Sequence, residues 1–487
     1  MAKRKRSHRT PQARHGNKSP KSRHDRRKRL GVRNSNRRKT RVARVPLVGS
    51  IEMLAKHMSN FLDARIAFRL PIVLAGAMLA GSRRTASRWF RAAGIADDWD
   101  RFYDMLVSIG KSTGPLVFPL LSAIVSRFDP GQGKYWTLAL DDSPTKRFGR
   151  HVEAANVHHH PTPGPADGPW LFGHNWVCLA IIMSHSLWGA VALPILSKLY
   201  VRRVDVPKLK MRYGWEFRTK HQLALELVLE VIRRLKALGS KAGFRVVVDG
   251  AYAVRSFLRA LLSEDVTVIS RLRRDAKLFD LPPPRTGQRG RPRIYGENRI
   301  HLAKRAGHHA GWQSMTFTCR GLEVTRRYKT FLATSRLVGG AIRVVLLEHE
   351  NGNWAAYFST DVEMDVKTLL ETGANRWAIE EQFHDVKEVW GAGQQQVRNV
   401  WSNIGCWHLN TWLYTMVELA SWDVPAEELV DRSDRSWDNP SRRPSHADRR
   451  RRIMRQMLEN EFLTPLPAGS EAEKYQARIA ELLRIAV

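Results

Sequence analysis

The nine residues YWTLALDDS at positions 135–143 decide how the chain folds. A mainly apolar run ends abruptly in two adjacent carboxylates, Asp141 and Asp142. Such a run is typical of a buried strand, and an acid at the carboxyl end of a strand lies at the sheet edge where the sites of α/β proteins form. A second run of this kind, Phe244 to Val248, is followed by Asp249. Two such strands in one domain are a hint of a metal site.

A third segment, NRWAIEEQFHDVK at 375–387, has the character of a helix. Arg376, Glu380, His384 and Lys387 recur at helical spacing, so they share one face. An apolar stripe that can dock on the sheet lies beside this face (Ile379, Phe383 and Val386). The helix therefore presents a carboxylate flanked by cations. On spacing alone, an exposed helix with ordinary ion pairs explains the pattern equally well.

Phosphodiester cleavage explains why these residue types belong together. The reaction needs an activated water and a stabilised leaving oxygen, and two Mg²⁺ ions roughly 3.5–4 Å apart can supply both. Mg²⁺ prefers carboxylate oxygens, with water and substrate phosphate in its other positions. Three carboxylates from separate elements can hold such a pair, while Arg376 and Lys387 contact phosphate oxygens beside the metals.

On these motifs the chain resembles the DDE transposases of bacterial insertion sequences, over residues 135–400. Leu140–Ser143 resembles the first motif of that family and Val248–Tyr252 the second. The pattern Arg376-x3-Glu380-x6-Lys387 resembles the third, the Tyr-Arg-Glu-Lys signature of one large group. The Tyr of that signature falls on Gly373 here, so its supporting role is absent or moved.

The resemblance implies a ribonuclease H-like catalytic core and assigns Asp141, Asp249 and Glu380 as catalytic, metal-binding residues. It implies Mg²⁺, with Mn²⁺ as a substitute, and Arg376 and Lys387 as contacts to DNA phosphate. The implied reaction cleaves the ends of the element and transfers the freed 3′-OH to target DNA, carried out by a homodimer on double-stranded DNA.

Two neighbouring acids compete with the preferred residues. Asp142 is the alternative to Asp141, which we prefer because it fits the Asp-x-Ser pattern and because successive strand residues face opposite sides of a sheet. Glu381 is the alternative to Glu380, but it lies off the face that carries Arg376 and Lys387.

The pattern along the chain predicts an α/β fold with a mixed sheet, a β-rich insertion before the Glu380 helix, and helical regions at both ends. We expect a disordered basic arm over 1–45 and a helical DNA-binding region over 46–128. A turn and basic helix near 81–91 could read DNA as a helix-turn-helix. The remaining boundaries are a catalytic core at 129–270 and 366–405, the insertion at 271–365, and a helical C-terminal region at 406–487, which includes a basic run at 442–455.

Charge points to nucleic acid as the partner. The chain has 81 Lys and Arg against 46 Asp and Glu, a formal net charge of +35, and residues 1–45 hold 19 of these cations with one acid. A chain this basic favours a polyanion over a small neutral substrate.

The three widely spaced Cys residues form no disulfide framework, and the most apolar stretch, 176–199, is interrupted by polar residues and Pro. We therefore expect a cytoplasmic protein with no membrane span, and the resemblance to transposases of bacterial insertion sequences implies a nucleoid-associated protein of bacteria.

Two other functions stay open: a metal-dependent nuclease of the same fold that lacks strand transfer, and a non-catalytic DNA-binding protein derived from a transposase. A histidine-rich segment (His151, His158, His159, His160 and His174) could suggest a transition-metal site. Adjacent histidines cannot all face one ion, so a solvated loop is the better interpretation.

Overall fold

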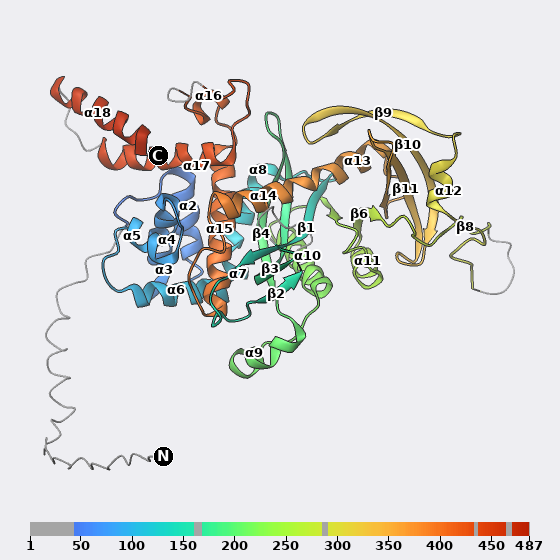
Figure 1. The fold of residues 1–487 in the computed structure, drawn as a ribbon, viewed down its shortest axis with the longest axis horizontal. Coiled ribbons are helices and arrows are strands. Elements are labelled where there is room, and N and C mark those ends of the chain that lie inside the picture. The colour runs from blue at the N-terminus through green and yellow to red at the C-terminus, as the bar shows by residue number, and fades with distance from the viewer. Residues whose placement is uncertain (1–42, 160–167, 285–290, 433–436, 464–469, 487) are drawn as a thin grey trace, which may run out of the picture. The chain divides into compact units, whose positions relative to one another are not determined.

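The computed structural model describes residues 43–159, 168–284, 291–432, 437–463 and 470–486 (Figure 1). The predicted basic arm lies outside the described residues except at its end. There, Ala43 and Val45 are already buried in the core. The backbone N–H of Arg44 donates to the carbonyl of Ala93.

Seven helices precede the first strand among the described residues. They are α2 (Gly49–Ser59), α3 (Ala64–Ala67), α4 (Arg69–Leu79), α5 (Ala86–Ala92), α6 (Trp99–Lys111), α7 (Thr113–Leu116) and α8 (Phe118–Phe128). Helix α4 is apolar on nearly every side and almost entirely buried, as expected of a helix surrounded by others. These helices occupy the segment that we predicted to be helical.

The central strands form a mixed sheet. They are β1 (Tyr135–Lys146), β2 (Asn156–His159), β3 (Trp170–His185), β4 (Gly189–Tyr200), β5 (Gly243–Val248) and β6 (Val266–Leu272). Strand β3 pairs antiparallel with β1, β2 and β4, whereas β1, β5 and β6 run parallel. The parallel crossovers pass through the elements η1 (Arg203–Asp205), α9 (Val206–Tyr213), α10 (Lys220–Ala237) and α11 (Arg255–Leu262).

Strand β1 continues beyond the point where we predicted its end. We expected it to end at Asp141, but it runs on to Lys146. Its parallel partner β5 does stop, with the last pair at Leu140 and Val248. The long strand β3 carries the pairing onward, from Asp141 opposite Cys178 to the end of β1. Asp141 therefore lies at the end of one pairing but inside the strand.

The segment predicted to be a β-rich insertion extends the same sheet. Its elements are β7 (Leu278–Phe279), β8 (Arg299–Ile300), α12 (Leu302–Gly307), β9 (Gln313–Cys319), β10 (Leu322–Ser335), β11 (Gly340–Glu348) and β12 (Trp354–Ser359). Because β12 pairs antiparallel with β6, the whole sheet has twelve strands along the path β2-β3-β1-β5-β6-β12-β11-β10-β7-β8, with β4 on β3 and β9 on β10. Strands β11 and β12 form the hairpin predicted at Asn351–Gly352, and Gly352 supplies a positive φ of 74°.

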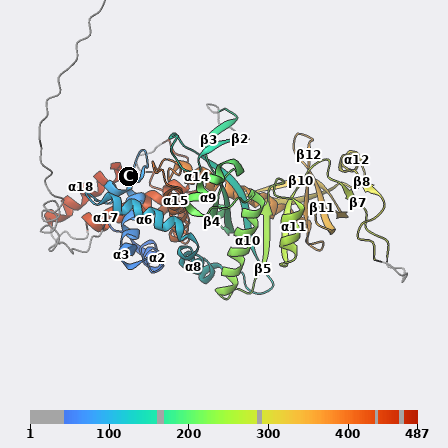
Figure 2. The same ribbon diagram turned by 90° about the horizontal axis from the view of Figure 1, so that it is seen from below.

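The chain then returns as helices α13 (Val366–Asn375), α14 (Trp377–Glu388), α15 (Val400–Ser421), α16 (Ala426–Leu429), α17 (His446–Phe462) and α18 (Ser470–Ala486). Helix α15 is buried along nearly its whole length, and it lies between the N-terminal helices and strand β4 (Figures 1 and 2). A register shift in the β3–β4 pairing leaves Ile195 without a partner. Its carbonyl accepts instead from the indole of Trp412, at 2.9 Å.

In the described part of the chain, no single helix is long and apolar enough to cross a membrane. One bent pair, Trp99–Lys111 with Thr113–Phe128 at 84°, reaches that length and composition.

Helices α6 and α15 approach each other through glycines. A Cβ at Gly405 would lie 2.2 Å from the carbonyl oxygen of Leu106, and one at Gly110 would lie 1.9 Å from that of Trp401. Both contacts are with backbone, which cannot rotate away. The two helix axes therefore depend on these positions having no side chain.

We predict that Gly405→Ala lowers the midpoint of thermal unfolding, because overpacking of this kind costs about 1–3 kcal/mol. Gly307→Ala is the matched control, since no atom lies within 4 Å of a Cβ built there. Equal melting of both variants and the wild-type protein would show that the glycines do not set this packing.

Candidate active site

Two of the predicted acids stand side by side at one edge of the sheet. Leu140 of β1 pairs with Val248 of the parallel strand β5, so Asp141 and Asp249 are the next residues along on neighbouring chains. Both are half-buried. Adjacent strands lie only about 4.8 Å apart, so the sheet itself places these two carboxylates as neighbours.

Arg376 links the third acid to this pair. It stands at the break between α13 and α14, where it ends one helix and begins the next. Its Nη1 lies 2.7 Å from Asp141 Oδ2, and its Nη2 lies 2.7 Å from Glu380 Oε1. Glu380 is in the first turn of α14, where the helix dipole favours a carboxylate. One guanidinium thus bridges an acid of the sheet and an acid of the helix.

Burial and neighbouring charges act in opposite directions on the pKa values of Asp141 and Arg376. Burial raises the pKa of Asp141 from 3.8 to about 6; Arg376 opposes the rise, while Asp142 and Glu380 add to it. For Arg376, burial acts to lower the pKa, but Asp141, Glu380 and Asp249 together raise it. Asp249 therefore acts on the same cation, although no hydrogen bond joins it to Arg376 among the described contacts.

Asp142, the alternative to Asp141, is held by other groups. Lys220 of α10 places its Nζ 2.6 Å from Asp142 Oδ2, and the hydroxyl of Tyr252 donates to Asp142 Oδ1 at 3.2 Å. Burial, with the neighbouring acids, raises the pKa of Tyr252 well above 10, so the phenol keeps its proton. These partners support the preference for Asp141, which stays a prediction. Tyr252 could have been found in the motif that follows Asp249, but no local signal pointed to Lys220.

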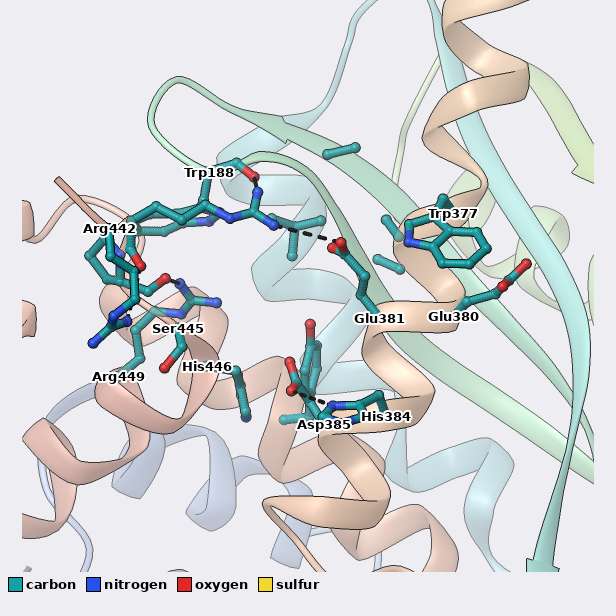
Figure 3. A pocket seen from close by; sticks show the side chains of 17 residues that line it. Trp188, Trp377, Glu380, Glu381, His384, Asp385, Arg442, Ser445, His446 and Arg449 are labelled. Carbon is teal, nitrogen blue, oxygen red and sulfur yellow. Dashed lines mark hydrogen bonds and ion pairs between the residues drawn. The ribbon is translucent and has the colours of Figure 1, made fainter. Parts of the chain in front are cut away.

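Glu381, the alternative to Glu380, has a different ion-pair partner. Both acids line a cavity of about 620 Å³, but Glu381 lies 3.6 Å from the guanidinium of Arg443, whereas Glu380 pairs with Arg376. Figure 3 shows Glu381 turned toward Trp188, whereas Glu380 leaves α14 in another direction. The two adjacent acids thus pair with different cations, and only Glu380 is linked through Arg376 to Asp141.

The rest of the predicted helix face is only partly assembled. Lys387 is half-buried, and burial lowers its pKa. It acts on the thiol of Cys178, the residue opposite Asp141 in β3, but makes no hydrogen bond or ion pair with the three acids among the described residues. His384 is exposed, and its Nδ1 lies 3.4 Å from the carboxylate of Asp385. It stands apart from the cluster.

The histidine-rich segment is structural, and the prediction of a solvated loop was wrong for two of its members. His158 and His174 lie buried in β2 and β3. Burial lowers their pKa values to about 4 and about 3, so both are neutral. His174 is fixed by Arg147 Nε at 3.2 Å and by the carbonyl of Glu153 at 2.9 Å. His160 lies outside the described residues.

No group of three or more His, Cys, Asp or Glu among the described residues is gathered closely enough to hold a metal ion. The donor set nevertheless suits a hard divalent cation, because it consists of carboxylates from three separate elements. Two of them, Asp141 and Glu380, already converge on one positive group, the guanidinium of Arg376.

We predict that Asp141→Asn stabilises the folded protein above neutral pH. Because the pKa of Asp141 is raised from 3.8 to about 6, its contribution to stability is fully present below the unfolded pKa and is lost as pH rises through about 6. The gain of the variant in unfolding free energy should reach at most about 3 kcal/mol near pH 8 and vanish near pH 4. Thermal unfolding at both pH values measures this. A variant that melts no higher than wild type near pH 8 contradicts it.

Comparison with known proteins places this site in a family. The family model described as "DDE superfamily endonuclease" matches residues 57–330, which include Asp141 and Asp249 and end before Glu380. None of the curated proteins compared matches the chain. Among solved structures, the chain is similar to a piggyBac transposase synaptic complex with hairpin DNA. The sequence identity is 10% and the TM-score is 0.37, over 92% of this chain and 79% of that chain. This similarity is too distant to support an assignment. The family match covers more than half of the sequence, and the chain is therefore an enzyme of the DDE endonuclease superfamily, as its motifs predicted.

Proposed function

We propose that the chain is a DNA transposase of an insertion sequence. It would cleave phosphodiester bonds at the ends of the element and transfer the freed 3′-OH to target DNA. The observation that carries this proposal is the convergence of Asp141 and Asp249 at one register of two parallel strands, with Glu380 joined to Asp141 through Arg376. Membership of the DDE superfamily supports it.

We further propose that the catalytic core is ribonuclease H-like. The strand order β4-β3-β1-β5-β6 supports this, with two antiparallel pairings on one side of β1 and two parallel pairings on the other. The Glu380 helix then returns across this sheet, where α14 packs on β1 and β4.

The three carboxylates would hold Mg²⁺, or Mn²⁺ in its place. When bound, the metal activates water and stabilises the leaving oxygen. Arg376 has five N–H donors, and its bonds to Asp141 and Glu380 use two of them. The others are available to phosphate oxygens beside the acids. Lys387 would supply a second cation, because it lies on the same helix as Glu380 and acts electrostatically on Cys178, the residue opposite Asp141.

Double-stranded DNA, as element end and as target, is the proposed partner. The formal net charge of +35 supports it, because phosphate contacts dominate affinity for DNA. A homodimer that holds two DNA ends, acting at the nucleoid in the bacterial cytoplasm, completes the proposal.

A nuclease of the same superfamily without strand transfer is the second candidate, since the family is described by its endonuclease activity. It would use the same acids for hydrolysis alone, so only the joining of a 3′-OH to target DNA separates the two functions. A non-catalytic derivative is the weaker candidate, because all three acids are present.

We predict that Glu380→Gln keeps DNA binding but lowers cleavage roughly 10³-fold or more, because loss of a residue that acts as part of a catalytic unit costs most of the rate. The assay uses labelled DNA that carries the element's own ends, with Mg²⁺ or Mn²⁺. Glu381→Gln is the matched control, since Glu381 faces Arg443 and not Arg376.

Joining of the cleaved 3′-OH to target DNA by wild type and by the control supports the transposase. Cleavage without joining favours the nuclease. If wild type binds but does not cut with either metal, the catalytic assignment is wrong.

A further inference from the structure

A second cavity, of about 970 Å³, lies where three distant segments of the chain meet. Its walls come from the turn before α5, from the end of β1 with the loop after it, and from the segment that follows α14. It is lined by four cations (Arg83, Lys146, Arg147 and Arg398), by Phe148 and by three consecutive glutamines at 394–396, and no acid is among the lining residues. We call this cavity the basic groove.

Arg147 builds the floor of the basic groove. It is buried, and its Nη1 donates to the carbonyls of Gly393 and Gln395 at 2.8 and 2.7 Å. Burial lowers its pKa only to about 10, so it stays charged at neutral pH. The end of β1 is thereby fixed to the segment after α14.

The glutamines hold the other wall. Gln394 Oε1 accepts from the backbone N–H of Arg84 at 2.8 Å, and Gln395 Nε2 donates to the carbonyl of Arg84 at 3.0 Å. Arg84 lies in the turn that leads into α5, the predicted DNA-reading helix. The groove is thus preorganised, because its three segments are joined by buried or half-buried hydrogen bonds.

The open side of the groove carries positive charge and one aromatic ring. Arg83, Lys146 and Arg398 are exposed, and Phe148, which lines the same cavity, is 84% exposed. An exposed aromatic ring amid cations, without an acid among the lining residues, is complementary to a polyanion that also offers sugar and base surfaces. An acidic peptide would match the charge but offers no sugar or base surface to the exposed ring.

The distance from the basic groove to the acids suits duplex DNA. Lys146 lies five residues beyond Asp141 on β1, which is about 17 Å at the strand rise of 3.3 Å per residue. Helix α14 also connects the two places: it covers about 12 Å from Glu380 to its end at Glu388, and Ala392 of the basic groove lies four residues beyond that end. Since successive base pairs are about 3.4 Å apart, this separation is about five base pairs.

We propose that the basic groove binds the substrate duplex about five base pairs from the phosphate that is cut. This inference rests on the proposed function. The exposed cations contact phosphates there, and Phe148 packs against sugar or base surface. The groove thus fixes the position of the DNA end relative to the three acids and joins the α5 region to the catalytic core.

The first test is equilibrium binding of the full-length chain to a labelled mixed-sequence duplex over a range of salt. The groove variant combines Arg83→Ala, Lys146→Ala and Arg398→Ala. The control variant combines Lys134→Ala, Lys236→Ala and Lys241→Ala, which removes the same charge from exposed positions at the opposite end of β1 and β5. Each phosphate contact contributes about 0.9 to the slope of log K against log salt, so the groove variant should lose roughly 2–3 from the slope and the control less than about 1.

The second test locates the DNA. Phe148→Cys carrying a thiol-linked photo-crosslinker, in the Glu380→Gln background, should attach to nucleotides about five base pairs from the cleavage position. The same chain without Phe148→Cys gives the background from Cys319, because Cys178 and Cys406 are buried.

The outcomes separate the two proposals. Equal loss of affinity in the groove and control variants, or crosslinks scattered along the duplex, overturns the basic groove and leaves the proposed function standing. Failure of wild type to bind DNA at all overturns the proposed function, and this inference with it.

Discussion

The two ion pairs of Arg376 are the interaction on which the site depends. This side chain holds a carboxylate of the sheet and a carboxylate of the helix at 2.7 Å each. Two half-buried acids cannot both ionise close together without a cation between them. Burial already raises the pKa of Asp141 to about 6 with Arg376 present. Arg376 can play this role because it stands at the break between α13 and α14. The carboxylates at this sheet edge need a positive charge between them, and either Arg376 or a divalent metal can provide it.

Helix α14, which follows that break, packs on β4, β1 and α15. Helix α15 packs between β4 and the N-terminal helices, and a second buried cluster fixes α17 against it. There, Glu418 is fully buried; burial acts to raise its pKa, but Arg449 and His446 lower it, so the carboxylate is ionised. The imidazole of His446 lies 2.5 Å from Glu418, and the guanidinium of Arg449 lies 2.8 Å from it. These polar partners in the core thus hold α15 and α17 together.

Local patterns predicted much of this architecture and missed what depends on distant partners. The apolar runs before Asp141 and Asp249 and the helical spacing around Glu380 reflect burial within one element, which sequence periodicity reports directly. The hairpin at Asn351–Gly352 follows from the conformational preference of the turn residues themselves. The extension of β1 depends on pairing with β3, and the fusion of the insertion with the core depends on β12 meeting β6. The basic run 442–455 is in part internal, because Arg450, for example, donates to carbonyls at the end of α4. The bridge from Arg376 to Asp141 joins residues 235 positions apart, which no local pattern reveals.

Iron-directed backbone cleavage tests the central claim most directly. Fe²⁺ can replace Mg²⁺ at carboxylate sites, and with ascorbate and peroxide it generates hydroxyl radicals that cut the chain near the bound ion. If Asp141, Asp249 and Glu380 form one metal centre, the breaks will cluster at these three positions. Excess Mg²⁺ will suppress them, and Asp249→Asn will weaken all three together. Cuts elsewhere, such as at His158 and His159, or cuts that Mg²⁺ does not suppress, would contradict the assignment of a shared carboxylate centre.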